Sequence, residues 1–208
     1  MIREMLSRLR IIPVLTVSSP EQALAVCEAL QAGGIQGVEI TLRSDAALDS
    51  ISRVREAMPD FIVGAGTVKT ATDLDSVAER GAAFAVSPGL SDDVVTRALA
   101  RSTPLLPGVA TASELMRGLA AGLDCFKLFP AEAVGGRALL KSLAAPFPEA
   151  AFCPTGGVNL DNVSDYLALP NVLCVGGSWM VADDLLARED WPEVARLSAA
   201  AMELAGRV

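Results

Sequence analysis

Short apolar runs recur along the whole chain, about every 20 to 25 residues. Amphipathic segments of helical period separate the runs, and several of these segments open at Ser, Thr, Asp or Asn and close at Gly. Strand and helix are therefore predicted to alternate from one end of the chain to the other. The eight runs occupy residues 11–17, 37–43, 61–67, 83–89, 104–109, 125–130, 151–157 and 172–178.

Near-continuous apolar runs are typical of parallel strands that are buried on both faces. Eight strand–helix units with short connections predict an α/β fold, a single-domain (β/α)8 TIM barrel over residues 1–208. The opening MIREMLSRLR predicts an extra N-terminal helix, and residues 183–206 predict the eighth helix of the barrel. An open doubly wound sheet is the alternative, but its edge strands should be more polar than any of the eight runs. In such barrels the catalytic and substrate-binding residues lie at the C-terminal ends of the strands and in the loops that follow.

Composition and charge narrow the classes of partner. The chain is 51% hydrophobic and 4% aromatic, so its core must be built mainly from Ala, Val, Leu and Ile. A net charge of -8 disfavours binding to nucleic acid or to anionic membranes. No apolar run approaches the roughly 20 residues that span a bilayer, and the opening does not read as a signal peptide. We therefore expect a cytoplasmic protein that binds neither nucleic acid nor membrane.

The chain contains no histidine. This excludes Ser-His-Asp and Cys-His nucleophiles, imidazole bases and the most common zinc ligand. The cysteines are isolated, without a C-x-x-C pair, which favours buried reduced thiols over metal ligands. We therefore expect no metal, and chemistry carried by carboxylates, lysine, hydroxyls, arginine and backbone amides. The four cysteines are Cys27, Cys125, Cys153 and Cys174.

One lysine lies within an apolar run. Lys69 and Lys141 fit solvated surface positions, whereas Lys127 stands in the middle of C-F-K-L-F-P. A charge buried there costs several kcal/mol unless it is paired or neutralised. A structural ion pair is one interpretation of Lys127. The other is a Schiff-base nucleophile, because desolvation favours the neutral amine that attacks a ketone.

The second run, G-V-E-I-T-L-R, carries three polar side chains on one face. The period of two places Glu39, Thr41 and Arg43 together, and the opposite face must pack on helices. The polar set is therefore predicted to line the barrel interior toward its mouth. In one interpretation Glu39 and Arg43 neutralise each other. In the other, Arg43 clamps a substrate carboxylate and Glu39 acts as general acid and base, which with Lys127 makes an imine-forming lyase site.

Other candidate binding residues follow later strands. Thr67, at the end of G-A-G-T, is expected to bond the same carboxylate, while Pro88 of S-P-G and Phe129 beside Lys127 are expected to line the pocket. The turns after the last two strands offer backbone N–H groups that we expect at helix N-termini, where barrels hold a phosphate. These predicted phosphate ligands are Thr155, Gly156, Gly157, Gly176, Gly177 and Ser178.

Six segments together resemble the 2-keto-3-deoxy-6-phosphogluconate (KDPG) aldolase family. The match runs in order over nearly the whole chain. The resemblance implies a class I aldolase that cleaves this phosphorylated keto acid to pyruvate and glyceraldehyde 3-phosphate, and often also cleaves 4-hydroxy-2-oxoglutarate. It further implies a homotrimer that needs no metal. The segments are E-I-T-L-R, G-A-G-T, S-P-G, F-K-L-F-P-A-E, C-P-T-G-G-V and G-G-S-W.

The resemblance also implies roles for single residues. Lys127 matches the lysine that forms the Schiff base, Glu39 the proton shuttle, and Arg43 and Thr67 the pyruvate-binding pair. The glycines and serine after the last strands match phosphate ligands. One departure concerns the first strand, where some relatives carry arginine in V-L-R and this chain has Val14-Leu15-Thr16. The substrate preference on that side of the pocket stays open.

Two other classes of function fit part of the pattern. A sugar-phosphate isomerase or a thiamine-phosphate-synthase-like enzyme would share the glycine turns, and so would a non-catalytic sugar-phosphate sensor. The isomerase or synthase-like enzyme does not need a lysine buried in the sixth strand, whereas the sensor would have kept the pocket. Formation of pyruvate would separate the aldolase from both.

Overall fold

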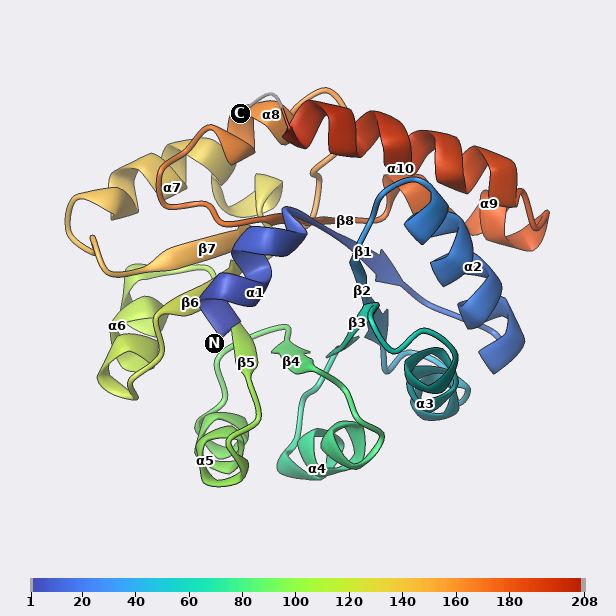
Figure 1. Ribbon diagram of the computed structural model, residues 1–208. Helices are drawn as coiled ribbons and strands as arrows, with labels where there is room; N and C mark the ends of the chain where they lie inside the picture. The colour runs from blue at the N-terminus through green and yellow to red at the C-terminus, as the bar shows by residue number, and fades with distance from the viewer. Residues whose placement is uncertain (1, 207–208) are drawn as a thin grey trace.

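The computed structural model describes residues 2–206, in which eight parallel strands are surrounded by helices (Figure 1). Hydrogen-bonded neighbours follow the order β7-β6-β5-β4-β3-β2-β1-β8, and isolated parallel bridges join β7 to β8 at Phe152–Val172 and Thr155–Gly176. The predicted (β/α)8 barrel is confirmed, and the open sheet is excluded. The strands are β1 Ile11–Leu15, β2 Gly37–Thr41, β3 Ile62–Gly66, β4 Phe84–Ser87, β5 Leu105–Val109, β6 Cys125–Leu128, β7 Ala151–Pro154 and β8 Val175–Gly177.

Each strand lies inside a predicted apolar run, and the helices follow in the gaps. Polar side chains start several of them: Ser19 accepts a hydrogen bond from the Gln22 amide, and Thr70 and Thr111 each form a capping box. The outer helices of the first seven strand–helix units are α2 Pro20–Ala32, α3 Ala47–Ala57, α4 Ala71–Glu79, α5 Asp92–Arg101, α6 Ala112–Ala120, α7 Gly136–Ala144 and α8 Val163–Leu167, with a 3-10 turn η1 at Glu132–Val134. None of the described helices is long and apolar enough to cross a membrane.

The last segment departs from the prediction of one helix over 183–206. After a 3-10 turn, η2 at Trp179–Val181, it forms two helices, α9 Asp183–Ala187 and α10 Trp191–Ala205. Glu189 between them has a φ of 53°, a left-handed conformation that ends a helix. The Asp190 side chain then accepts from the Glu193 amide and starts the next helix. Asp190 followed by Pro192 is a helix-start signal in the sequence that the prediction of one helix overlooked.

The extra N-terminal helix, α1 Ile2–Leu9, lies across one end of the barrel (Figure 1). Its Leu6 and Leu9 are fully buried in a cluster inside the barrel. This helix closes the end where the strands begin, so the barrel is open where the strands end. The other members of the cluster are Ile12, Phe84, Val86, Leu106, Cys125, Ala151, Cys153 and Cys174.

All four cysteines are buried and free of disulfides, as predicted. Burial raises the pKa of the Cys27 thiol to about 12, with a smaller contribution from Glu28. Burial likewise raises the pKa of Cys125 to about 12. These two thiols therefore stay protonated near neutral pH and serve packing rather than chemistry. The prediction of one domain over 1–208 includes Met1, Arg207 and Val208, which lie outside the described residues, and it stays a prediction.

Candidate active site

Lys127 and Glu39 meet inside the barrel, although 88 positions separate them in the chain. Lys127 stands on β6 and Glu39 on β2, and the lysine Nζ donates to Glu39 Oε1 at 3.1 Å and Oε2 at 3.2 Å. Only 7% and 5% of the two side chains are exposed. Each buried charge therefore depends on the other for stability. The alternative in which Glu39 and Arg43 neutralise each other is wrong.

Gly66, the last residue of β3, makes room for the Glu39 carboxylate. It lies opposite Thr41 of β2 in the strand register. A Cβ at this position would overlap the carboxylate and would lie 2.7 Å from Glu39 Cγ, closer than real Cβ contacts come. The glycine is therefore required by the position of the acid and not by an unusual backbone conformation.

We predict that Gly66→Ala lowers kcat by about 10²-fold, the scale of a misplacement of about 1 Å in a catalytic group. The added methyl must push the Glu39 carboxylate away from Lys127. Gly89→Ala is the matched control, because nothing lies within 4 Å of the position where its Cβ would stand. Steady-state kinetics with circular dichroism check the result, and equal activity of the two variants would contradict it.

Arg43 and Thr67 lie side by side at the barrel mouth. Arg43 Nε donates to Thr67 Oγ1 at 3.2 Å, and Arg43 is exposed. Thr67 has a φ of 60°, which is strained for a β-branched residue and is typical of functional sites. The Phe129 ring centroid lies 5.3 Å from Lys127 Nζ. The Arg43 guanidinium and the Thr67 hydroxyl therefore form a pair that can bind a carboxylate.

Thr41, which ends β2, has a structural contact instead. It is fully buried, donates to the Leu15 carbonyl at 3.1 Å and lies 2.8 Å from the Thr16 hydroxyl. Its one proton goes to Leu15, so the Thr16 hydroxyl is the donor in the pair. Thr41 therefore ties β2 to the end of β1.

A cavity of about 160 Å³ joins this mouth to the glycine turns of β7 and β8. In it, Gly156 and Gly157 have φ values of 99° and 84°. Thr155 forms an isolated parallel bridge with Gly176, and in the described chain no hydrogen bond is found for the Gly157 amide. A backbone N–H group beside a cleft suits an anion. The cavity is lined by Val14, Arg43, Phe129, Thr155, Gly156, Gly157, Val158, Gly177 and Ser178.

Two expectations for this cleft need correction. The Gly156–Gly157 pair does not begin a helix: it lies in a loop, and α8 begins only at Val163. Gly176 and Gly177 belong to β8, and Ser178 precedes only the short turn η2. Gly176 is absent from the described lining of the cavity, and a side chain on it would overlap Thr155. Gly176 leaves room for the Thr155 side chain, and the predicted phosphate ligands Gly156 and Gly157 lie in a loop rather than at a helix end.

The remaining predicted site residue, Pro88, lies outside the residues that line the cleft. Pro88 is exposed at the end of β4, and its carbonyl lies where a side chain on Gly108 would stand. Its role in binding stays a prediction. Sequence reasoning missed Val14 and Val158, because apolar strand residues give no signal of a cleft wall. Among residues 2–206, no cluster of three or more His, Cys, Asp or Glu side chains is arranged to hold a metal ion.

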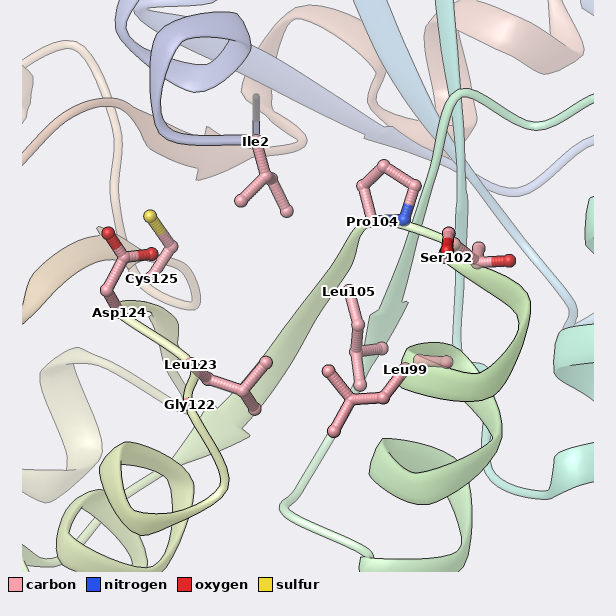
Figure 2. Close-up of a pocket in the computed structure, with 11 residues that line it drawn as sticks. Ile2, Leu99, Ser102, Pro104, Leu105, Gly122, Leu123, Asp124 and Cys125 are labelled. Atoms are coloured by element: carbon pink, nitrogen blue, oxygen red, sulfur yellow. The ribbon is translucent and has the colours of Figure 1, made fainter.

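Further cavities lie on other parts of the barrel. One adjoins the cleft through Val14, Arg43 and Ser178 and is also lined by Thr16, Trp179 and Asp183. Another is an apolar groove at the opposite end of the barrel, where β5 and β6 begin. Figure 2 shows Leu99 and Leu123 facing each other across this groove. None of the predicted site residues lines it.

Comparisons with known proteins agree with this geometry. A sequence profile of "KDPG and KHG aldolase" matches residues 2–197. The 2-dehydro-3-deoxy-phosphogluconate aldolase of Pseudomonas aeruginosa is 48% identical over 194 residues, 93% of this chain and 88% of that protein. The KHG/KDPG aldolase of Escherichia coli K12 is 46% identical over 193 residues, 93% of this chain and 91% of that protein.

A solved structure is similar over almost its whole length. The KDPG aldolase of Legionella pneumophila, crystallised with pyruvate captured at low pH as a covalent carbinolamine intermediate, superposes with a TM-score of 0.94. The two chains are 41% identical, and the match covers 97% of this chain and 98% of that one.

Proposed function

Since this chain belongs to the KDPG and KHG aldolase family, we propose that it cleaves 2-keto-3-deoxy-6-phosphogluconate to pyruvate and glyceraldehyde 3-phosphate through an imine on Lys127. The chain is a carbon–carbon lyase. The observation that carries the mechanism is the Lys127 amine, enclosed in the barrel within 3.2 Å of both Glu39 oxygens. Through this contact the Lys127 ammonium can transfer a proton to the Glu39 carboxylate before the neutral amine attacks a ketone.

The first half of the reaction forms the imine. The substrate carboxylate binds the Arg43 guanidinium and Thr67, which brings the 2-ketone over Lys127. The neutral amine attacks the ketone, and Glu39 supplies the proton with which water leaves. The protonated imine then withdraws electrons from the C3–C4 bond.

The second half breaks the carbon chain. A base removes the C4 hydroxyl proton and the C3–C4 bond breaks. Glyceraldehyde 3-phosphate departs, and an enamine remains on Lys127. The phosphate binds at the loop of Gly156 and Gly157, beside Ser178, in the cavity that these residues line. Protonation of the enamine by Glu39 and hydrolysis of the imine give pyruvate. 4-Hydroxy-2-oxoglutarate, which lacks the phosphate, uses the same pyruvate half of the site.

Reduction with borohydride in the presence of pyruvate tests this function. We expect intact mass and peptide mapping to find one stable pyruvate adduct, on Lys127, because the imine is the species that borohydride reduces. Exposed Lys69 and Lys141 serve as internal controls for non-specific reduction. A folded protein that binds pyruvate without forming the adduct would make Lys127 a structural ion-pair residue and would favour the isomerase.

The proposal extends to the cellular setting. We expect a homotrimer that acts in the cytoplasm, in the Entner–Doudoroff pathway, as the family resemblance implies. Leu99 on α5 and Met116 on α6 are 53% and 60% exposed, on successive helices of the barrel. Such residues fit the burial of an apolar surface between subunits. The mass measured by light scattering, against 21.6 kDa for one chain, decides the subunit number.

A further inference from the structure

We propose that Glu132 and Tyr166 hold the glycine loop, Thr155–Gly157, in the shape that binds a phosphate, and are positioning residues for phosphorylated substrates. The inference rests on the proposed function, because it takes the glycine loop to be the phosphate site. Neither residue lines the cavity that this loop borders. They act from the opposite side of the loop.

The segment between β6 and α7 touches every residue of the glycine loop. The Ala131 amide donates to the Thr155 carbonyl at 2.8 Å, and the Glu132 amide donates to the Gly156 carbonyl at 3.1 Å. The Glu132 side chain packs on Gly157, where an added Cβ would lie 2.5 Å from Glu132 Cγ and 2.7 Å from its Cβ. The stem of Glu132 therefore occupies the space beside Gly157.

Tyr166 of α8 fixes the other end of the Glu132 side chain. Tyr166 is completely buried, and its hydroxyl donates to Glu132 Oε1. Burial, together with the bond to Glu132, raises the pKa of Tyr166 above its ordinary value, so the phenol stays a neutral donor. Gly136, with a φ of 49°, leaves room, since a Cβ there would lie 2.7 Å from the Tyr166 hydroxyl and 3.1 Å from Glu132 Oε1. Glu132 is thus held between Gly136 and Gly157.

The glycine loop has a reason to need this support. Gly156 and Gly157 have no side chains to restrict them, and both adopt positive φ values, so the free loop has many conformations. A phosphate that had to order the loop would bind more weakly by the free energy of that ordering. Contacts that fix the loop beforehand keep it in the shape that lines the cleft. They favour the phosphate half of the substrate and leave the pyruvate half, at Lys127, unaffected.

Kinetics on two substrates test the proposal. We expect Tyr166→Phe to raise KM for 2-keto-3-deoxy-6-phosphogluconate by about 5-fold, the scale of one lost hydrogen bond. Glu132→Ala, which also removes the stem, should raise it further. For 4-hydroxy-2-oxoglutarate, which has no phosphate, KM and kcat should stay at wild-type values. Glu132→Gln keeps an acceptor for Tyr166 and should restore most of the affinity for the phosphorylated substrate.

Arg137→Gln is the matched control, because it removes the Arg137–Asp165 ion pair between the same two helices, α7 and α8, and that exposed pair does not touch the glycine loop. It should leave both substrates unchanged. If Tyr166→Phe weakens both substrates equally and lowers Tm, the pair is only structural and the proposal is overturned. Tyr166→Phe removes only the hydroxyl oxygen and keeps the buried ring. The proposal can therefore still be tested with this variant if Glu132→Ala fails to fold. A failed proposed function would appear separately, as a wild-type chain that forms no pyruvate adduct.

Discussion

Lys127→Ala is expected to abolish cleavage of the phosphorylated keto acid and to abolish the borohydride-trapped pyruvate adduct. No other lysine in the described chain lies in the barrel interior, so no second amine can form the imine. Residual binding through Arg43 and the glycine loop should remain, because those groups do not touch Lys127. Turnover measured by pyruvate release and adduct formation measured by mass spectrometry check the two losses together.

The Lys127→Ala experiment needs a control for folding. Removing the lysine leaves Glu39 buried without its partner, which costs about 3–5 kcal/mol of stability for a buried pair. A double variant, Lys127→Met with Glu39→Gln, removes both charges, and we expect it to unfold at a higher temperature than Lys127→Ala while staying inactive. Exposed Lys141→Ala should keep wild-type turnover. Wild-type activity in folded Lys127→Ala would refute the assignment.

Glu39→Gln is expected to lower kcat by about 10²- to 10⁴-fold, the contribution of a positioned general acid or base. The amide keeps an oxygen that accepts from Lys127 Nζ, so the geometry of the pair survives while its proton-transfer capacity is lost. The pyruvate adduct should still accumulate, more slowly. Exchange of the pyruvate methyl protons with deuterium, followed by NMR, should slow by a similar factor, because it needs the same base.

Asp183→Asn is the matched control for Glu39→Gln. Asp183 lines the cavity that adjoins the cleft, and its substitution removes one carboxylate charge without touching Lys127. We expect wild-type methyl exchange in this variant. Normal exchange in Glu39→Gln would mean that another group moves the proton, and Glu39 would then serve only to pair with the lysine.

Much of the site could be read from local pattern. A lysine inside an apolar run was predicted to be buried. Its neighbours Phe126 and Leu128 belong to the apolar core shared with the outer helices, so Lys127 points the other way, into the barrel. The two-residue period predicted Glu39, Thr41 and Arg43 on one face. The structure has Glu39 and Thr41 buried in β2, whereas Arg43 lies beyond the end of the strand and is exposed. The glycine turns were visible because only glycine adopts their positive φ values without strain.

Other features depend on contacts between distant segments. No local signal says that Glu39 pairs with Lys127 rather than Arg43, since that choice depends on the distance across a closed barrel. The overlap that makes Gly66 obligatory exists only once β3 lies beside β2. The hydrogen bond between Glu132 and Tyr166 likewise needs α8 to pack behind the glycine loop.

The sequence by itself determined the barrel, its open end and the residues that face inward, because apolar periodicity and side-chain alternation are properties of single strands and helices. Tertiary structure alone decided which charged groups pair, and that the Gly156–Gly157 pair lies in a loop packed against Glu132 rather than at a helix end. The ion pair and the packing behind the glycine loop depend on distances between elements. Those distances are fixed only when the whole barrel closes and excludes water from its interior.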